Sequence, residues 1–223
     1  MGAAIGEILG NAVGVAISPV PIIAVILMLF TARAAGNSLS FLAGWVIGLS
    51  VVGAVVLALG LQSSDGEESA ASGWIKVVIG VLFLGLAVKQ WSSRPTGHEE
   101  PTMPGWMASI DQFTAPKSFG IGFLLSAVNP KNLGLTIAAM AKVSTSGLST
   151  AEEIGTLVVF VVIASLTVAA PVLLNVILGA RAQPTLTTMK DWLAENNSTV
   201  MTVLFVVLGA KLLGDGIAVL AKA

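Results

Sequence analysis

One short stretch, "SAVNPKNL" at residues 126–133, interrupts an otherwise apolar segment with residues that can do chemistry. Pro130 lacks an N–H group and disrupts the preceding helical turn, so that nearby carbonyls lose their donors. Lys131 adds a positive charge, and Asn129 and Asn132 add amides. Ionisable groups are costly inside a bilayer and usually mark a transport path or a paired structural site. We expect Lys131 to contact an anionic group and the two asparagines to bond hydroxyl groups.

A second proline motif, "SPVP" at Ser18–Pro21, lies in the first apolar segment of the chain. Pro19 and Pro21 also leave carbonyls without helical donors. Backbone of this kind is tolerated at membrane depth only where protein buries it or where it lines a water-filled cavity. Taken alone, the motif is explained by a packing kink; paired with residues 129–132, it suggests two interrupted helices around one site.

Four further residues are weaker candidates for a transport path: Asn11, Lys89, Lys211 and Asp215. Lys211 and Asp215 are one helical turn apart, so an ion pair can neutralise the lysine. Snorkelling towards the interface explains Lys89 and Lys211 more simply than contact with a substrate. Carboxylates deep in the apolar segments are scarce, which favours an anionic or amphiphilic cargo over a bare metal cation.

The composition indicates an all-α integral membrane protein. Of the 223 residues, 55% are hydrophobic and 10% charged, and the mean hydropathy is +0.92. A span needs about 20 apolar residues, and the sequence offers six such segments. They are Ile8–Phe30, Leu39–Leu61, Trp74–Trp91, Ser118–Ala141, Ile154–Leu178 and Thr199–Leu220. The first continues past the length of a signal peptide, so we interpret it as a retained span.

Several classes of function are disfavoured by what the sequence lacks. It has no cysteine, and its single histidine, His98, lies in a polar loop, so we expect neither a metal site nor a thiol relay. The net charge of -1, without a basic run, gives no reason to expect nucleic acid. No nucleophile–base pair or phosphate-binding loop is evident, so we expect neither an enzyme nor a cofactor.

An internal repeat relates the two halves of the chain. "VLFLGLAVK" at Val81–Lys89 and "VLFVVLGAK" at Val203–Lys211 agree at five of nine positions. Because each half has an odd number of spans, tandem halves would have opposite orientations, as in many secondary transporters. We therefore expect two inverted three-helix repeats, residues 1–91 and 117–223, with Pro-broken first and fourth helices. A polar loop at residues 92–116 separates them.

Within this loop, "WMASIDQF" places Trp106, Met107, Ile110 and Phe113 at helix-like spacing. The segment fits a short helix lying in the membrane interface. It fits equally well a loop helix that packs on the protein. Glycines in the second span, and alanines and Ser165 in the fifth, predict close helix packing within the chain or between copies in a homodimer.

The distribution of basic residues predicts the orientation. Arg33, Arg94, Lys117, Arg181 and Lys190 fall in connections on one side, with Lys89 at a helix end beside them. The opposite side carries Lys76, Lys142 and Lys222, together with the acidic clusters Asp65–Glu68 and Glu152–Glu153. Because cytoplasmic loops are enriched in lysine and arginine, we expect both termini outside.

The chain resembles the peptidoglycolipid, or sulfolipid, addressing (GAP) proteins of the lysine-exporter (LysE) superfamily. The resemblance rests on "SPVP", "FLAGWVIGL", "VKQWSSRP", "WMASIDQFTAPKSFGIG" and "NPKN". It implies two inverted three-helix repeats in a bacterial plasma membrane and the export of large envelope glycolipids beside a lipid synthase or transport machinery. It also places Ser18, Pro19, Pro21, Asn129, Pro130, Lys131 and Asn132 at the core of the transport site. The cysteine pairs of the superfamily's thiol-relay branch are absent.

Three functions stay open on the sequence alone. The first is a transporter that exports or flips an anionic lipid or glycolipid across the plasma membrane by alternating access. The second is a gradient-driven exporter of small soluble solutes such as amino acids. The third is a non-transporting scaffold for lipid-synthesis enzymes, in which Lys131 would have a structural role.

Overall fold

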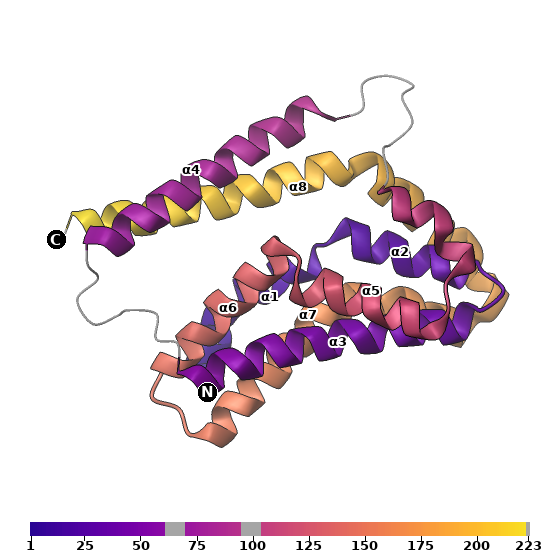
Figure 1. Ribbon diagram of the computed structural model, residues 1–223, viewed down its shortest axis with the longest axis horizontal. Coiled ribbons are helices and arrows are strands. Elements are labelled where there is room, and N and C mark those ends of the chain that lie inside the picture. The colour runs from indigo at the N-terminus through magenta and orange to yellow at the C-terminus, as the bar shows by residue number, and fades with distance from the viewer. Residues whose placement is uncertain (61–69, 95–103, 222–223) are drawn as a thin grey trace. The chain divides into compact units, whose positions relative to one another are not determined.

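The computed structural model describes residues 1–60, 70–94 and 104–221, and within these ranges the chain is helical with short connections. The elements are α1 (Gly2–Ala16), α2 (Pro19–Leu29), α3 (Ala34–Leu59), α4 (Ala70–Ser92), η1 (Gly105–Gln112), α5 (Ala115–Ala127), α6 (Pro130–Thr145), α7 (Thr150–Leu178), η2 (Gly179–Ala182) and α8 (Gln183–Leu220). Figure 1 labels the α-helices. The acidic cluster Asp65–Glu68, His98 and Lys222 lie outside the described residues.

Three helical stretches are long and apolar enough to cross a membrane: Ala34–Leu59, Gly73–Ser92 and Thr150–Leu220, the last comprising α7, η2 and α8. The pair α1 and α2 makes a fourth if it counts as one span, bent by 54° at its break. The expected fourth span, Ser118–Ala141, corresponds to two helices, α5 and α6, with a break before Pro130. The protein is therefore all-helical with up to four candidate spans among the described residues.

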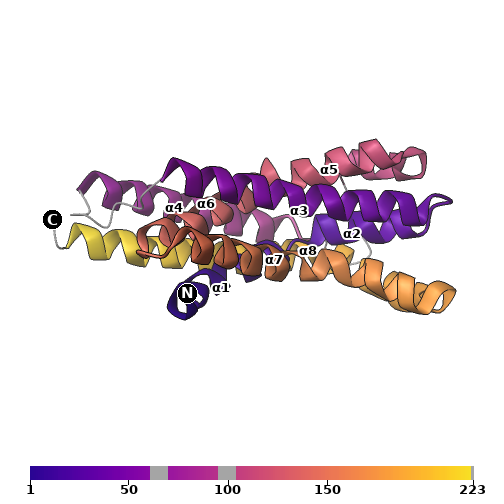
Figure 2. The same cartoon turned by 90° about the horizontal axis from the view of Figure 1, so that it is seen from below.

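The chain forms two compact units, each built from both halves of the sequence. Unit 1 takes its described residues from 1–63 and 103–193, and unit 2 takes them from 64–102 and 194–223. In unit 1, α3 packs along α5 and α7 packs along α1, while α2 and α6 each contact both α3 and α7 (Figures 1 and 2). Its fully buried large side chains include Ile23, Met28, Phe41, Trp45, Phe113, Met140 and Phe160.

Glycines allow α3 and α5 to approach each other closely. A Cβ atom at Gly44 would collide with the carbonyl oxygen of Phe119, and one at Gly122 would collide with the carbonyl oxygen of Phe41. Small residues permit such backbone contact between membrane helices. These glycines therefore serve packing within the chain, one of the two uses that the sequence left open.

The η1 segment packs on the protein. Met107, Ile110 and Phe113 are buried, and η1 contacts α2. Asn37 at the start of α3 donates a hydrogen bond from Nδ2 to the Phe113 carbonyl at 3.0 Å. Of the two interpretations of this segment, the geometry agrees with a loop helix held against its neighbours.

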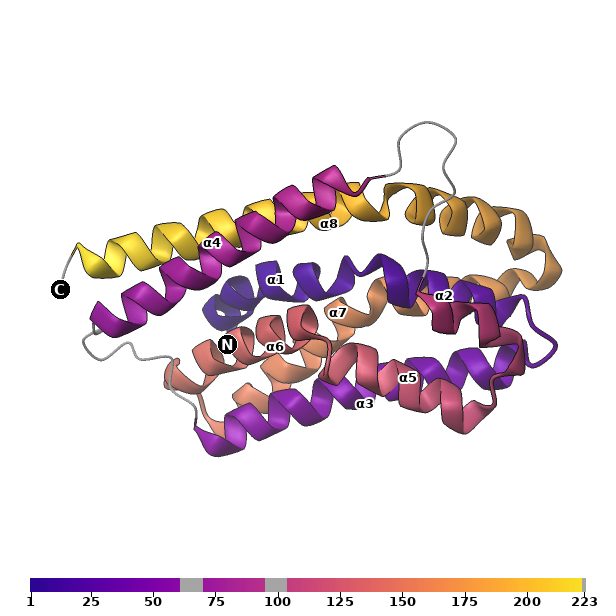
Figure 3. The same ribbon diagram turned by 45° about the horizontal axis from the view of Figure 1, so that its top comes forward.

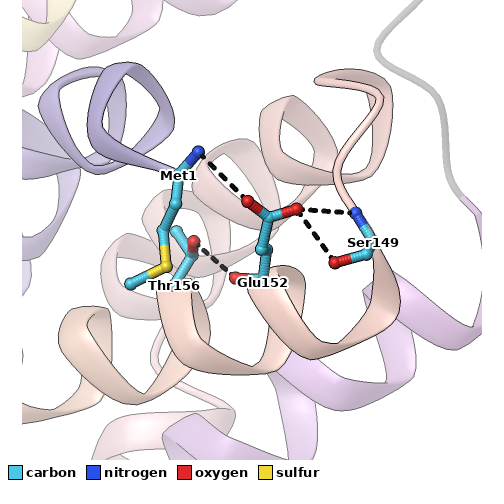
Figure 4. A network of polar contacts seen from close by, with 4 residues as sticks. All are labelled: Met1, Ser149, Glu152 and Thr156. Carbon is cyan, nitrogen blue, oxygen red and sulfur yellow. Dashed lines mark hydrogen bonds and ion pairs between the residues drawn. The ribbon is translucent and has the colours of Figure 1, made fainter.

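A polar network joins the start of α1 to the start of α7 (Figure 4). Ser149 and Glu152 form a capping box, with the Ser149 N–H and hydroxyl 3.1 and 2.9 Å from Glu152 Oε2. The Met1 ammonium lies 3.8 Å from Glu152 Oε1, and the Thr156 hydroxyl donates to the Glu152 carbonyl at 2.8 Å. The capping box satisfies N–H groups at the start of α7, while the exposed ion pair adds little.

Unit 2 pairs α4 with the later part of α8 (Figures 1 and 3). Phe83 and Phe205, which occupy matching positions in the two repeated sequences, lie with ring centroids 5.6 Å apart. A Cβ at Gly80 would approach the Gly209 carbonyl to 3.0 Å, and the reverse holds for Gly209 and Gly80. The repeated segments are thus each other's packing partners.

Candidate functional site

The site begins with a break in the backbone between α1 and α2. Because Pro19 and Pro21 have no N–H, they cannot bond the carbonyls of Val15 and Ile17 as a continuous helix would. The N–H of Ser18 bonds the Ala16 carbonyl at 2.8 Å. The last turn of α1 therefore presents carbonyls to be satisfied by other parts of the chain.

Lys131, from the first turn of α6, supplies donors for two of those carbonyls. Its Nζ donates to the carbonyls of Gly14 (3.0 Å) and Ile17 (2.8 Å) and to the hydroxyl of Ser18 (2.7 Å). An ammonium group has three donors, and all three are used here. The residue is 8% exposed, and its charge lies at the carbonyl end of α1, where the helix dipole favours a cation.

Two hydroxyl groups satisfy the remaining carbonyls of the break. Ser18 Oγ lies 2.7 Å from the Val15 carbonyl and 3.3 Å from Asn132 Oδ1. Thr167 of α7 donates to the Ala16 carbonyl at 2.6 Å. The broken end of α1 is thus tied to α6 through Lys131 and to α7 through Thr167.

The second break, between α5 and α6, is stabilised by the two asparagines. Asn129 is the N-cap of α6, and its Oδ1 accepts the Lys131 backbone N–H at 3.0 Å. Pro130 occupies the first position of α6, where no intrahelical donor is needed. Asn132 Nδ2 donates to the Leu125 carbonyl at 2.8 Å and so satisfies an acceptor at the end of α5.

The electrostatics of the site are those of a buried cation whose neighbours are neutral. The groups bonded to Lys131 Nζ are two carbonyls and a hydroxyl. Within the described part of the chain, no acidic side chain forms an ion pair with Lys131. Lys131 therefore bonds only uncharged groups of the chain among the described residues.

A model of the family described as Sap, sulfolipid-1-addressing protein, matches residues 8–218. The chain belongs to the sulfolipid-1-addressing protein family. No curated protein and no solved structure matches it. The resemblance drawn from the motifs is confirmed at the level of this family, and membership of the wider lysine-exporter superfamily stays a prediction.

In this sulfolipid-addressing family member, the principal predicted residues come together and the secondary ones do not. Ser18, Pro19, Pro21, Asn129, Pro130, Lys131 and Asn132 all lie at the two helix breaks. Asn11 is one of the secondary candidates, and it donates to the Leu135 carbonyl at 3.1 Å, joining α1 to α6. Lys89 and Lys211 are exposed in unit 2, and Lys211 pairs with Asp215 at 3.1 Å.

Thr167 is the member of this site that sequence reasoning missed. It lies within the apolar α7, four residues before Pro171, which cannot supply the N–H that would bond the Thr167 carbonyl. This spacing of threonine and proline was the available signal. Only the packing of α7 along α1 reveals that the threonine hydroxyl reaches the broken end of α1.

Proposed function

We propose that the protein exports or flips an anionic lipid or glycolipid across the plasma membrane of a bacterium by alternating access. The observation that carries the proposal is the buried Lys131 ammonium, which lacks an acidic partner within the described residues and lies between two broken helices. The family description, which names a sulfolipid, supports a lipid cargo with an anionic head group. Acyl chains could stay in the bilayer while the head group crosses.

In this proposal, Lys131 would exchange its backbone partners for the head group. A sulfate, phosphate or carboxylate offers stronger, charge-assisted hydrogen bonds than the carbonyls of Gly14 and Ile17. The positive end of the α6 dipole, whose first turn contains Lys131, would add to the attraction. Asn132 and Ser18 would bond hydroxyl groups of the cargo.

The exchange of partners gives a route from binding to conformational change. Lys131 ties α6 to the α1–α2 junction, so an anion that draws the ammonium away would free the carbonyls of Gly14 and Ile17. The junction would then relax towards a different bend, with the proline-bearing breaks acting as hinges. A ligand shifts such an equilibrium by its difference in affinity for the two states.

Two inverted repeats are the scaffold we propose for this movement. The α1–α2 pair would correspond to α5–α6, α3 to α7, and α4 to α8. Under this correspondence the packing of α1 on α7 is equivalent to the packing of α5 on α3. Phe83 is likewise equivalent to Phe205, the residue that it contacts. Transporters built this way place their substrate where the matched helices are interrupted.

The proposed orientation places both termini outside. In unit 1, Arg33 precedes α3, Lys117 is in the first turn of α5, and Arg181 lies between α7 and α8. These three connections lie at the same end of the unit in Figure 1. The positive-inside rule would place that end in the cytoplasm.

Native mass spectrometry of the full chain, released from its own membranes, tests the proposal. Wild type is compared with Lys131→Met, and Lys211→Met serves as the control that removes an exposed lysine. We expect wild type and the control to retain an anionic lipid that the Lys131→Met variant loses. Identical lipid profiles in folded wild type and Lys131→Met would contradict the proposal.

A second measurement covers the case in which Lys131→Met fails to fold. Wild-type protein in nanodiscs is titrated with phosphatidylglycerol and, separately, with zwitterionic phosphatidylcholine. Preferential, saturable binding of the anionic lipid supports a head-group site. Equal weak binding of both lipids, together with thermal stabilisation by soluble amino acids, would replace lipid export by export of a soluble solute.

A further inference from the structure

An apolar cavity of about 470 Å³ lies in unit 1 between α2, α7 and the first turns of α8. Its walls include Ile22 of α2, Thr167 and Ala170 of α7, and Met189, Trp192 and Leu193 of α8. Binding sites for small molecules typically measure about 300–1,000 Å³, so the cavity is large enough for a ligand.

The chemistry of these walls suits hydrocarbon. Ile22, Ala170, Met189 and Leu193 present aliphatic or thioether surface, and thioethers adapt to flexible apolar ligands. The hydroxyls of the two threonines in the wall, Thr167 and Thr188, already donate to the carbonyls of Ala16 and Pro184. A polar solute would therefore lose its hydration without regaining hydrogen bonds, whereas an acyl chain has none to lose.

The α7 helix connects this cavity with an exposed apolar surface. Leu166, Ala170, Leu173 and Ile177 follow one another at helical spacings of three and four residues and so share one face of α7. The leucines are 57% and 56% exposed and Ile177 is 75% exposed. Acyl chains of a bilayer covering this face would reach the cavity past Ala170, which belongs both to this face and to the wall.

Thr167 also connects the cavity to the head-group site. Its side chain forms part of the wall and donates to the carbonyl of Ala16, and the next carbonyl along the chain, that of Ile17, accepts from Lys131. We propose that the cavity holds an acyl chain of a membrane lipid whose anionic head group occupies the junction at Lys131. The head-group half of this assignment rests on the proposed function, whereas the acyl-chain half rests on the cavity.

Photolabelling of the full chain in nanodiscs tests the acyl-chain site. The probe is phosphatidylglycerol with a photoactivatable diazirine in the middle of one acyl chain, and labelled peptides are mapped by mass spectrometry. We expect labels concentrated on the α2, α7 and α8 segments that line the cavity. Unlabelled phosphatidylglycerol should compete for these labels, because a cavity, unlike the annular lipid shell, saturates.

Two tryptophan variants on the same face of α7 make the test specific. Ala170→Trp places an indole in the cavity, and we expect it to reduce cavity labelling roughly tenfold. Leu166→Trp adds the same side chain one turn earlier, at an exposed position outside the wall, and should leave the labelling unchanged. If Ala170→Trp does not fold, competition by unlabelled lipid in the wild type decides the question.

Labels spread evenly over the exposed helices, or labels in folded Ala170→Trp as strong as in wild type, would overturn the acyl-chain site. Retention of anionic lipid that depends on Lys131 is measured separately, so the proposed function could stand after that result. Conversely, the cavity labelling could saturate in a protein that shows no preference for anionic lipid. That result would support the acyl-chain site and contradict the assignment of the head group to Lys131.

Discussion

Lys131 and Lys211 both lie in apolar helices and were both candidates for contact with substrate, yet the structure treats them differently. Lys131 is 8% exposed and bonds two carbonyls and a hydroxyl at the break between α1 and α2. The Lys211 side chain is 55% exposed and pairs with Asp215 at 3.1 Å, one turn along the same helix. The comparison shows two ways in which a lysine in an apolar helix is accommodated. Lys211 is neutralised by a carboxylate one turn away on its own helix, whereas Lys131 bonds the free carbonyls of a broken helix that is distant in sequence.

The two environments also predict very different energetic roles. An exposed ion pair one helical turn apart contributes at most about 1 kcal/mol, because water screens it and both side chains lose freedom. A buried donor that satisfies carbonyls is harder to replace, since removing it leaves those carbonyls without partners. We therefore expect Lys131 to contribute both to the stability of the α1–α2 junction and to the binding of an anionic head group.

Replacement of Lys131 is the strongest way to test this contrast, and we expect it to have the largest effect. Lys131→Met retains the length of the side chain and removes its donors, so the carbonyls of Gly14 and Ile17 lose their partners. We expect a loss of about 1–3 kcal/mol for each carbonyl in the free energy of unfolding. Unfolding by SDS titration in detergent micelles measures it. An unchanged midpoint would show that water or a backbone shift replaces the ammonium.

Restoring the N–H groups that the prolines of the α1–α2 break lack should reduce the contribution of Lys131 to stability. We expect this effect to be smaller than that of replacing Lys131. The double variant Pro19→Ala and Pro21→Ala supplies N–H groups for the carbonyls of Val15 and Ile17, so the junction should depend less on Lys131. Residues sharing such a network show interaction energies of about 0.5–3 kcal/mol. We expect the destabilisation by Lys131→Met to shrink by an amount in this range when measured in the proline-free background. Simple additivity of the two changes would show that Lys131 does not compensate for the N–H groups that the prolines lack.

Lys211→Met should have the smallest effect of the three. The pair with Asp215 is exposed and local, so we expect a change of at most about 1 kcal/mol in the free energy of unfolding. Retention of anionic lipid should equal that of wild type. A loss of lipid in this variant comparable to that in Lys131→Met would erase the distinction between the two lysines and place a second cation on the transport path.

Residue types alone identify much of the candidate site. Proline has no N–H wherever it lies, so Pro19 and Pro130 mark broken helices by their chemistry alone. A lysine with flanking asparagines in an apolar segment is unusual for the same local reason. In the structure, Lys131 bonds the carbonyls of Gly14 and Ile17, more than a hundred residues away in sequence, and so brings the two motifs side by side.

Other parts of the fold were less predictable because neighbours in space decide them. Pro130 predicts a break within the segment Ser118–Ala141, which forms α5 and α6, but the side-chain capping of α6 by Asn129 is seen only in the structure. The η1 segment fits two interpretations by its apolar spacing. The contact of η1 with α2 and the hydrogen bond from Asn37 to Phe113 distinguish them.

By itself, the sequence determined the helical class, the apolar segments, the breaks and the cation, because hydropathy and the missing N–H of proline are properties of residues. Only the tertiary structure decided which acceptors the Lys131 ammonium finds, that Thr167 completes the junction, and that α2, α7 and α8 line an apolar cavity. The physical reason is that hydrogen bonds and cavities depend on distances between segments far apart in the chain, and no local pattern encodes those distances.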